Sequence, residues 1–312
     1  MVHVAVIGSG RVGGEVAFTL AFERYVTRLS LVDVAPKVSE MVKEELAHAI
    51  ANHVFDIHID AYNAAEDVED ADLIVVAAGF PRTPGMSRRE LAGRNAGIVK
   101  AVVEATVDKN PRAWYFIITN PVDAMSTLAS RILDDPHKVV GTGTNLETSR
   151  FRTILARELG VPCGMVEAYV GGEHGDAAVL LWSTVKVDGE PLNEYVARTG
   201  KKLEKQACEE YVKDVSQEII RVLGGTRHGP AGSFIEIIRG IVLNTGKIMS
   251  YSRLRTYETT PTPVHVTVPA RIARSLGPDL WESLAEEERK AIKDAAGIVH
   301  RTFSECAGEY SC

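Results

Sequence analysis

The chain contains 312 residues, of which 45% are hydrophobic, and it carries a formal net charge of −7 with an isoelectric point near 5.8. This length suffices for a large core and for two joined domains, whereas the acidic balance argues against a nucleic-acid partner. No apolar stretch reaches the roughly 20 residues that cross a membrane, and the N-terminus lacks the pattern of a signal peptide. We therefore expect a cytoplasmic protein without nucleic-acid or membrane partners.

The four cysteines show neither CxxC pairing nor a metal-ligand spacing with histidine; they are Cys163, Cys208, Cys306 and Cys312. This pattern predicts reduced thiols and no metal site. A disulfide between the last two cysteines is left open.

The first 33 residues have the pattern of a strand, a glycine turn and a helix. An apolar run stops at GSGRVGG, a helical pattern follows over 12–24, and a second apolar strand ends on Asp33, twenty residues after Gly13. In this dinucleotide-binding fingerprint Gly8 makes the tight turn, Gly10 admits the pyrophosphate and Gly13 lets the helix pack closely. The helix N-terminus attracts the phosphates.

Asp33 bears on the choice of cofactor. A carboxylate at this position accepts hydrogen bonds from the ribose hydroxyls and repels a 2′-phosphate, which favours NAD over NADP. Because Val34 and the loop after it can tolerate some NADP, the stringency of this choice is left open.

Strand and helix signals alternate through the first half, as in a parallel α/β sheet. Asn120 is expected to cap a helix that has Pro121 at its first position. The further predicted elements of this half are helices over 34–53, 88–108 and 121–133 and strands over 58–62, 73–78, 114–119 and 139–141. Together they predict a Rossmann-type, doubly wound parallel sheet in a first domain, 1–143.

The second half has a different pattern, and we expect a mixed α+β substrate-binding and catalytic domain over 144–312. A cleft between the domains should lie at the carboxyl ends of the parallel strands. The predicted elements are strands over 165–170, 178–187, 252–259 and 264–268, a turn at Asp188-Gly189, and helices over 201–223, 232–249 and 284–306.

Two polar segments follow strands in the first half. The loop before residue 88 contains Arg82 and is expected to act as a lid, with Arg88 at its hinge and a capping box of Ser87 and Glu90. A solvated basic loop is an equally good interpretation. The amide of Asn120 is either a helix cap alone or also a contact to substrate or nicotinamide.

Two more polar segments lie in the second half. In NLETSR, Asn145 is expected to cap a helix that has Glu147 in its first turn and Arg150 on the same face. These two form either a local ion pair or a carboxylate and a guanidinium that point into the cleft. In GGEHGD, His174 is flanked by glycines and titrates near neutrality, as a general acid/base must. With a nicotinamide nearby, the set indicates hydride transfer to a carbonyl compound that bears a carboxylate.

The segments GSGRVGG, AGFPRTPGMSR, TNPVD, NLETSRFR, GGEHGD and GGTRHGPA resemble the lactate/malate dehydrogenase family in order and spacing. The resemblance implies that His174 exchanges a proton with the substrate C2 oxygen and that Arg150 grips the C1 carboxylate as a bidentate fork. It implies that Arg88 polarises the carbonyl and that Asn120 and Thr226 line the pocket. It also suggests a homodimer or homotetramer.

Arg82 distinguishes the substrates of the family. Members that act on lactate have an uncharged Gln at this loop position, whereas members that act on malate have Arg, as here. A guanidinium can pair with the second carboxylate of oxaloacetate, and pyruvate would leave it without a partner. The resemblance thus implies an NAD-dependent dehydrogenase of the lactate-dehydrogenase-like malate branch, acting on a dicarboxylate of the tricarboxylic acid cycle.

One residue departs from the family pattern. Glu147 stands where the family usually has Asp beside its histidine. Its carboxylate can still orient the imidazole of His174 and stabilise the imidazolium, but the extra methylene must be absorbed locally. Asp176, only two residues from His174, is poorly placed to reach the ring.

The predicted cofactor-binding residues are Gly8, Gly10, Arg11, Val12, Gly13, Asp33, Gly79, Asn95, Thr119 and Asn120. The alternatives to malate oxidation are a lactate or other 2-hydroxyacid dehydrogenase, an NAD-dependent glycosidase, and a non-catalytic NAD-binding module.

Overall fold

The fold is described from a computed structural model over residues 2–53, 55–80 and 88–307. Its first half forms a parallel sheet in the order β3-β2-β1-β4-β5-β6, the doubly wound arrangement of dinucleotide-binding domains. These strands are β1 (Val2–Ile7), β2 (Val26–Val32), β3 (His58–Tyr62), β4 (Leu73–Val76), β5 (Trp114–Ile117) and β6 (Val139–Gly141).

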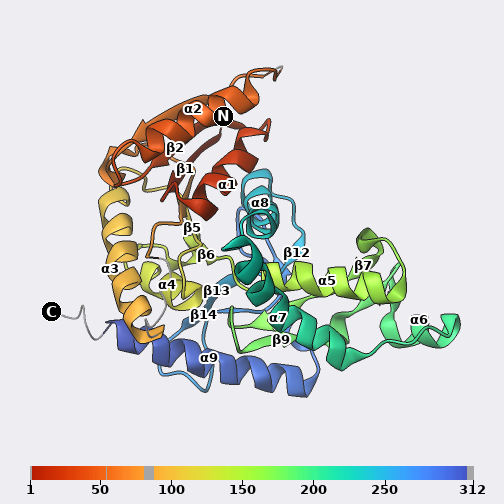
Figure 1. The fold of residues 1–312 in the computed structure, drawn as a ribbon. Helices are drawn as coiled ribbons and strands as arrows, with labels where there is room; N and C mark the ends of the chain where they lie inside the picture. Colours follow the sequence, from red (N-terminus) through yellow and green to blue (C-terminus); the bar gives the residue numbers. More distant parts are fainter. Residues whose placement is uncertain (1, 54, 81–87, 308–312) are drawn as a thin grey trace.

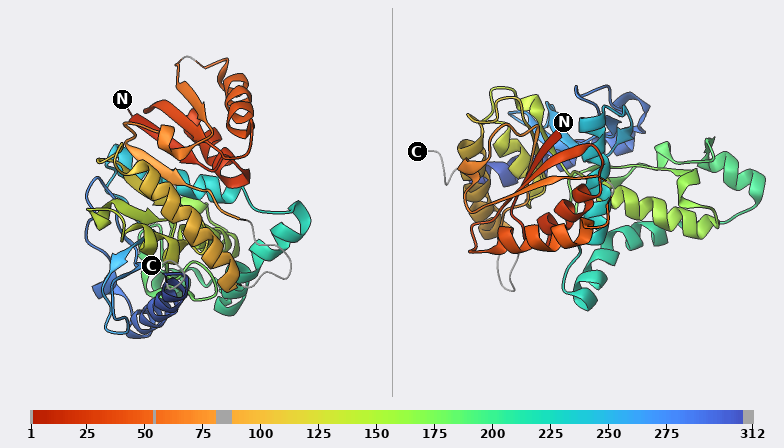
Figure 2. Two further views of the ribbon diagram at one scale, coloured as in Figure 1. Left: turned by 90° about the vertical axis from the view of Figure 1, so that its left-hand side faces the viewer. Right: turned by 90° about the horizontal axis from the view of Figure 1, so that it is seen from above.

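Helices cover both faces of this sheet (Figures 1 and 2). One face packs against α1 (Arg11–Ala21), α2 (Val38–Ile50) and α8 (His228–Leu243), and the other against α3 (Arg88–Thr106), α4 (Val122–Ala129) and α9 (Glu286–Ala307). In β1, Val4 and Val6 face the first group of helices, whereas Ala5 and Ile7 face the second. Burial on both faces explains why this strand is a continuous apolar run.

The second half continues the sheet with antiparallel strands in the order β13-β14-β8-β9 after β6. A small sheet, β11-β10-β7, lies with α5 and α6 in an arm that projects from the rest of the molecule (Figure 2, right). The elements are α5 (Asn145–Leu159), β7 (Val166–Glu167), β8 (Val170–Gly172), β9 (Ala178–Leu180), β10 (Lys186–Val187), β11 (Glu190–Pro191), α6 (Leu192–Thr199), α7 (Lys205–Leu223), β12 (Ile248–Met249), β13 (Ser252–Arg255), β14 (Val264–Thr267) and β15 (Ala270–Arg271). The predicted fold class, a doubly wound sheet followed by a mixed α+β part, is confirmed.

Two predicted strands are each broken in the structure. The apolar run over 165–170 divides into β7 and β8, and the run over 178–187 divides into β9 and β10 around the 3₁₀ turn Trp182–Thr184. The chain passes from the small sheet to the large one at the first break and back to the small sheet at the second, and an apolar run does not reveal a change of sheet.

Several helix boundaries also differ from the prediction. The helix after the glycine turn ends at Ala21, the helix after Pro121 ends at Ala129, and α6 was not predicted. The helix predicted over 232–249 is α8, which ends at Leu243 because Asn244 adopts a left-handed conformation with φ 56°.

Both predicted asparagine caps are wrong. Pro121 occupies the N-cap of α4, after a cis Asn120-Pro121 bond. Thr144 occupies the N-cap of α5, and Asn145 is already helical. The amide of Asn145 donates instead to Ser233, at 2.9 Å to its carbonyl oxygen and 3.0 Å to its hydroxyl, so a tertiary contact has replaced the local capping role.

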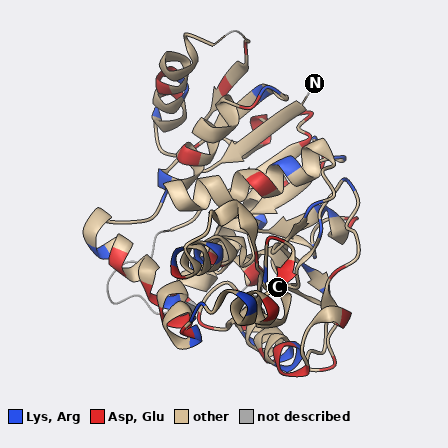
Figure 3. Cartoon of the chain, turned by 90° about the vertical axis from the view of Figure 1, so that its right-hand side faces the viewer, with Lys and Arg blue, Asp and Glu red and all other residues tan. Residues whose placement is uncertain are grey.

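No helix in the described ranges is long and apolar enough to cross a membrane. The positions of acidic and basic residues alternate along the ribbon in Figure 3. Cys163 and Cys208 are free thiols. Cys312 lies outside the described residues, and so does the disulfide with Cys306 that the sequence left open.

Candidate active site

The glycine turn between β1 and α1 has the geometry of a phosphate-binding turn. Gly8 has a φ of +96°, and a Cβ on Gly13 would lie 1.8 Å from the carbonyl oxygen of Gly8. Gly10, in contrast, faces open space, with no heavy atom within 4 Å of an added Cβ. Gly10 is also the N-cap of α1 and offers no side-chain cap. The first N–H groups of α1, which begins with Arg11 and Val12, can therefore bind an anion at this open turn.

Asp33 lies at the end of β2, beside this turn. Its carboxylate accepts backbone N–H bonds from Ser9 and Ala35, each at 2.9 Å. Asp33 lines a cavity of about 550 Å³ together with Gly8, Gly10 and Gly79. These residues fit the adenosine end of a dinucleotide, because the cavity is of ligand size and its carboxylate is fixed by the backbone.

The side-chain amide of Asn95 joins the loops that follow β4 and β5. Its oxygen accepts the N–H of Phe80 at 2.7 Å, and its nitrogen donates to the carbonyl of Asn120 at 2.7 Å. The hydroxyl of Thr119 donates to Ala78 at 2.7 Å. Asn95 and Thr119 thus hold the loops at the ends of β4 and β5, and their direct contact with the cofactor stays a prediction. The side chain of Asn120 is exposed.

The start of α5 is fastened to β8 by two threonines. The hydroxyl of Thr144 donates to the carbonyl of Val170 at 2.6 Å, and the hydroxyl of Thr148 accepts the N–H of Val170 at 2.9 Å. Glu147 lies between these threonines in the first turn of α5. The loop that follows β8 contains His174, so these two bonds set the distance between the carboxylate and the imidazole.

Glu147, Arg150 and His174 meet in the structure. Nδ1 of His174 lies 3.2 Å from Oε2 of Glu147, and Nη1 of Arg150 lies 3.4 Å from Oε1 of the same carboxylate. The side chains of Glu147, Arg150 and His174 are 8%, 14% and 22% exposed. The longer Glu therefore reaches the ring, and its bond to Nδ1 leaves Nε2 available to a substrate.

The protonation of this pair follows from its surroundings. Burial lowers the pKa of His174, but the charge and hydrogen bond of Glu147, with the charge of Asp123, outweigh burial and raise the pKa to about 9. Burial raises the pKa of Glu147, yet His174 and Arg150 hold it below its usual value. At neutral pH the pair is an imidazolium beside a carboxylate.

Asp123 is a neighbour of His174 that the sequence interpretation missed. It lies in the first turn of α4, is 2% exposed, and accepts the backbone N–H of His174 at 2.7 Å. An acid inside an otherwise apolar helix just after a strand end was the signal available in TNPVD.

A second cavity, of about 750 Å³, lies between α5, α7 and the start of α8. It brings Arg150 and Thr226 together with Arg11 of the glycine turn. The guanidinium of Arg11 lies against Gly225, where an added Cβ would be 2.3 Å from Nη1. Predicted substrate-binding and cofactor-binding residues thus share one cavity. Arg82 and the side chain of Arg88 lie outside the described residues.

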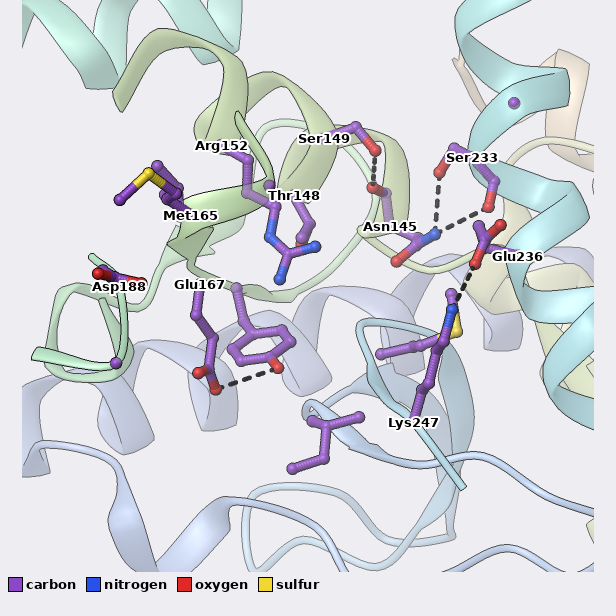
Figure 4. A pocket seen from close by; sticks show the side chains of 17 residues that line it. Asn145, Thr148, Ser149, Arg152, Met165, Glu167, Asp188, Ser233, Glu236 and Lys247 are labelled. Carbon is purple, nitrogen blue, oxygen red and sulfur yellow. Dashed lines mark hydrogen bonds and ion pairs between the residues drawn. The ribbon is translucent and has the colours of Figure 1, made fainter. Parts of the chain in front are cut away.

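A third cavity, of about 690 Å³, lies beside α5 (Figure 4). Its polar side chains pair with one another: Asn145 contacts Ser233, and Lys247 lies 3.2 Å from Glu236. The contact of Asn145 with Ser233 anchors α5 to α8, and thereby holds in place the helix that presents Glu147. No group of three or more His, Cys, Asp or Glu side chains in the described part of the chain could hold a metal ion.

A doubly wound sheet with an open glycine turn, an acid after the second strand and a histidine–carboxylate pair beside an arginine is typical of a dinucleotide-dependent dehydrogenase. Residues 2–141 match the NAD-binding domain of the lactate/malate dehydrogenases, and residues 144–306 match the α/β C-terminal domain of the same family. The chain belongs to the lactate/malate dehydrogenase family, whose cofactor is NAD.

Individual relatives span almost the whole chain. It is 38% identical to the malate dehydrogenase of Sulfolobus acidocaldarius, over 97% of this chain and 96% of that protein. It is 33% identical to the L-lactate dehydrogenase of Thermus aquaticus, over 95% of this chain and 96% of that protein. The malate dehydrogenase of Archaeoglobus fulgidus in complex with NADH superposes with a TM-score of 0.86 at 28% identity, over 98% of this chain and 99% of that one.

Proposed function

We propose that this protein is an NAD-dependent malate dehydrogenase that interconverts L-malate and oxaloacetate. The observation that carries the proposal is the contact of Glu147 with both His174 and Arg150, beside the cavity that also contains Arg11 of the glycine turn. Arg82 in the lid sequence and the similarity to malate dehydrogenases over nearly the full chain support the dicarboxylate substrate.

In this mechanism each residue has one task. NAD, when bound, supplies the hydride acceptor for oxidation and, when reduced, the hydride donor. His174 gives a proton to the C2 oxygen during reduction and takes it back during oxidation. Glu147 holds Nδ1 and stabilises the imidazolium. Arg150 binds the C1 carboxylate, Arg82 pairs with the second carboxylate and Arg88 polarises the carbonyl.

The roles of the remaining site residues follow the same scheme. We propose that Asn120 and Thr226 line the pocket for substrate and nicotinamide. The proposed cofactor-binding residues are Gly8, Gly10, Arg11, Val12, Gly13, Asp33, Gly79, Asn95, Thr119 and Asn120.

The test is oxidation of NADH by oxaloacetate in the presence of EDTA. We expect turnover that EDTA does not reduce and that His174→Asn abolishes, because the mechanism uses a protein acid and no metal. Absence of turnover would indicate a non-catalytic NAD-binding module, and hydrolysis of glycosides would indicate an NAD-dependent glycosidase. The similarity to L-lactate dehydrogenases makes lactate oxidation the second candidate.

We also propose a cytoplasmic homodimer or homotetramer that serves the tricarboxylic acid cycle, with the chain divided into domains near residue 143. Exposed apolar side chains of α1, α2 and α7 support association, because isolated chains seldom leave such surfaces uncovered. These side chains include Phe18, Phe22, Met41, Ile220 and Leu223. Light scattering on the purified protein measures the oligomeric state, and a monomer at micromolar concentration would contradict this part.

A further inference from the structure

Asp123 is a carboxylate in an unfavourable place. It is 2% exposed, and its neighbours in α4 include the buried apolar residues Val122, Ala124 and Met125. Taking an ionised carboxylate out of water costs several kcal/mol unless partners compensate for the lost hydration. The contacts that the Asp123 carboxylate makes therefore have to explain why an acid is present at this buried position.

Both oxygens of Asp123 bind segments of the second half of the chain. Oδ2 accepts the backbone N–H of His174 at 2.7 Å, and Oδ1 accepts the hydroxyl of Ser252 in β13. One side chain thus joins α4, the loop after β8 and strand β13. The bond to the N–H fixes the backbone of His174, whereas Glu147 fixes its ring.

The charged groups around the histidine come from two helices. Glu147 and Arg150 of α5 and Asp123 of α4 act on His174. His174, Glu147 and the phenol of Tyr257 in turn lie close enough to Asp123 to interact with it electrostatically. A second negative charge on the side of α4 therefore favours the imidazolium form of His174.

Packing alone does not explain an acid at position 123. Burial raises the pKa of Asp123 to about 6, although the bonds to Ser252 and His174 oppose this rise. A carboxyl whose pKa is raised on folding loses stability as the pH rises from its ordinary value of 3.8 to about 6, and this loss is complete at neutral pH. At neutral pH a neutral amide of the same shape would cost the fold less than the carboxylate does.

We propose that Asp123 is a positioning residue for proton transfer, which holds the backbone of His174 in place and keeps its imidazole protonated at neutral and mildly alkaline pH. The inference rests on the proposed function, because it takes His174 as the group that protonates oxaloacetate. Asp123 acts through His174 and does not itself contact the substrate.

Asp123→Asn tests the charge while preserving the shape. The amide oxygen can accept the His174 N–H, and the amide nitrogen can donate to the hydroxyl of Ser252. We expect an unchanged or higher Tm at pH 7. The alkaline fall of kcat for oxaloacetate reduction should move down by about one pH unit, because an opposite charge beside the imidazole is lost. KM for oxaloacetate below that fall should stay within about twofold.

Thr127→Val is the matched control. Thr127 lies one turn further along α4, is buried, and accepts the backbone N–H of His265 at 2.9 Å. This bond joins the same helix to the second half without reaching His174. We expect a lower Tm and an unchanged pH profile, so the control separates loss of a buried bridge from loss of the charge.

A pH profile of Asp123→Asn that coincides with that of the wild type would overturn the inference and leave the proposed function intact. If Asp123→Asn does not fold, an NMR titration of ¹³C-labelled His174 in the wild-type protein tests the inference instead. The resonance, assigned with His174→Asn, should show a minor inflection as Asp123 ionises near pH 6 besides its own titration. A single inflection overturns the inference, and this measurement needs no turnover.

Discussion

At the scale of the residue, the proposed chemistry depends on the contact of Glu147 with His174. A carboxylate at 3.2 Å from Nδ1 fixes the tautomer and stabilises the charged ring. Glu147 is one methylene longer than the Asp that the family resemblance leads one to expect here. The position of α5 relative to β8 therefore has to accommodate the longer side chain. The threonine bonds to Val170 set that position.

Glu147→Gln removes the charge but keeps a hydrogen-bonding side chain. We expect kcat for oxaloacetate reduction to fall by about 10² or more, because the imidazolium loses its main stabilising partner, while the Kd for NADH stays within a few-fold. Stopped-flow and fluorescence titration measure the two quantities. Glu158→Gln, on an exposed position of the same helix, is the control. Equal losses of turnover and cofactor affinity would contradict the role.

The same pair makes stability depend on pH. The pKa of His174 is raised from 6.5 to about 9 by its partners, so its contribution is fully present below about pH 6.5 and is lost as the pH rises through about 9. Glu147→Gln should therefore lower Tm most near pH 6, with a difference that shrinks towards pH 9. A difference in Tm that grows from pH 6 to pH 9 would contradict the predicted direction of this pH dependence.

We propose that Arg82 selects the substrate. Arg82→Gln should lower kcat/KM for oxaloacetate and raise kcat/KM for pyruvate, since the second carboxylate loses its cation and a methyl group no longer faces an unpaired guanidinium. The ratio of the two constants should change by about 10² or more. An unchanged ratio would assign substrate choice to another residue.

We propose that the choice of NAD over NADP rests on Asp33. Asp33→Ser removes the carboxylate that repels a 2′-phosphate, so the ratio of kcat/KM for NADPH to that for NADH should rise by about tenfold or more. Steady-state kinetics with both cofactors measures it. An unchanged ratio of kcat/KM for NADPH to that for NADH would mean that the loop after Val34 excludes the 2′-phosphate.

At the scale of the element, α5 is the part that assembles the site. Its first turn binds β8 through Thr144 and Thr148, and the amide of Asn145 binds Ser233 in α8. Glu147 and Arg150 are therefore presented from a helix held on two sides.

Thr148→Val tests this support. The substitution leaves the buried N–H of Val170 unpaired, which costs about 1–3 kcal/mol, and loosens the loop that contains His174. We expect a lower Tm together with a lower kcat. Glu158→Gln, on an exposed position of α5 outside the cavity that Arg150 lines, should change neither quantity appreciably. A lower Tm with full kcat would show that α5 and the His174 loop are aligned by other contacts.

The sequence predicted the elements whose local pattern matches their final environment. The apolar run before Gly8, the glycine turn and the acid at position 33 specify β1, α1 and β2 within a few residues. The prediction from sequence was wrong or incomplete where a tertiary contact determines what a side chain binds. Asn145 looked like a cap but binds Ser233, and Asp123 gave no local sign that it would meet the backbone of His174 from another part of the chain.

At the scale of the whole molecule, α8 joins the two halves. It belongs to the second half of the chain, yet it packs against α1 on the face of the first sheet (Figure 1). Arg239 of α8 pairs with Glu23, and His228 lies 2.6 Å from Glu15. This packing holds the glycine turn and the Arg150 cavity in one arrangement, so a dinucleotide bound at the turn can extend towards His174.

The ratio of kcat/KM for oxaloacetate to that for pyruvate, measured with NADH on the wild-type protein, tests the central claim most directly. We predict a preference for oxaloacetate of about 10³ or more, because a site with a cation for the second carboxylate rejects a substrate that lacks the matching anion. A ratio near one, or a preference for pyruvate, would contradict the assignment of malate and oxaloacetate as the substrates.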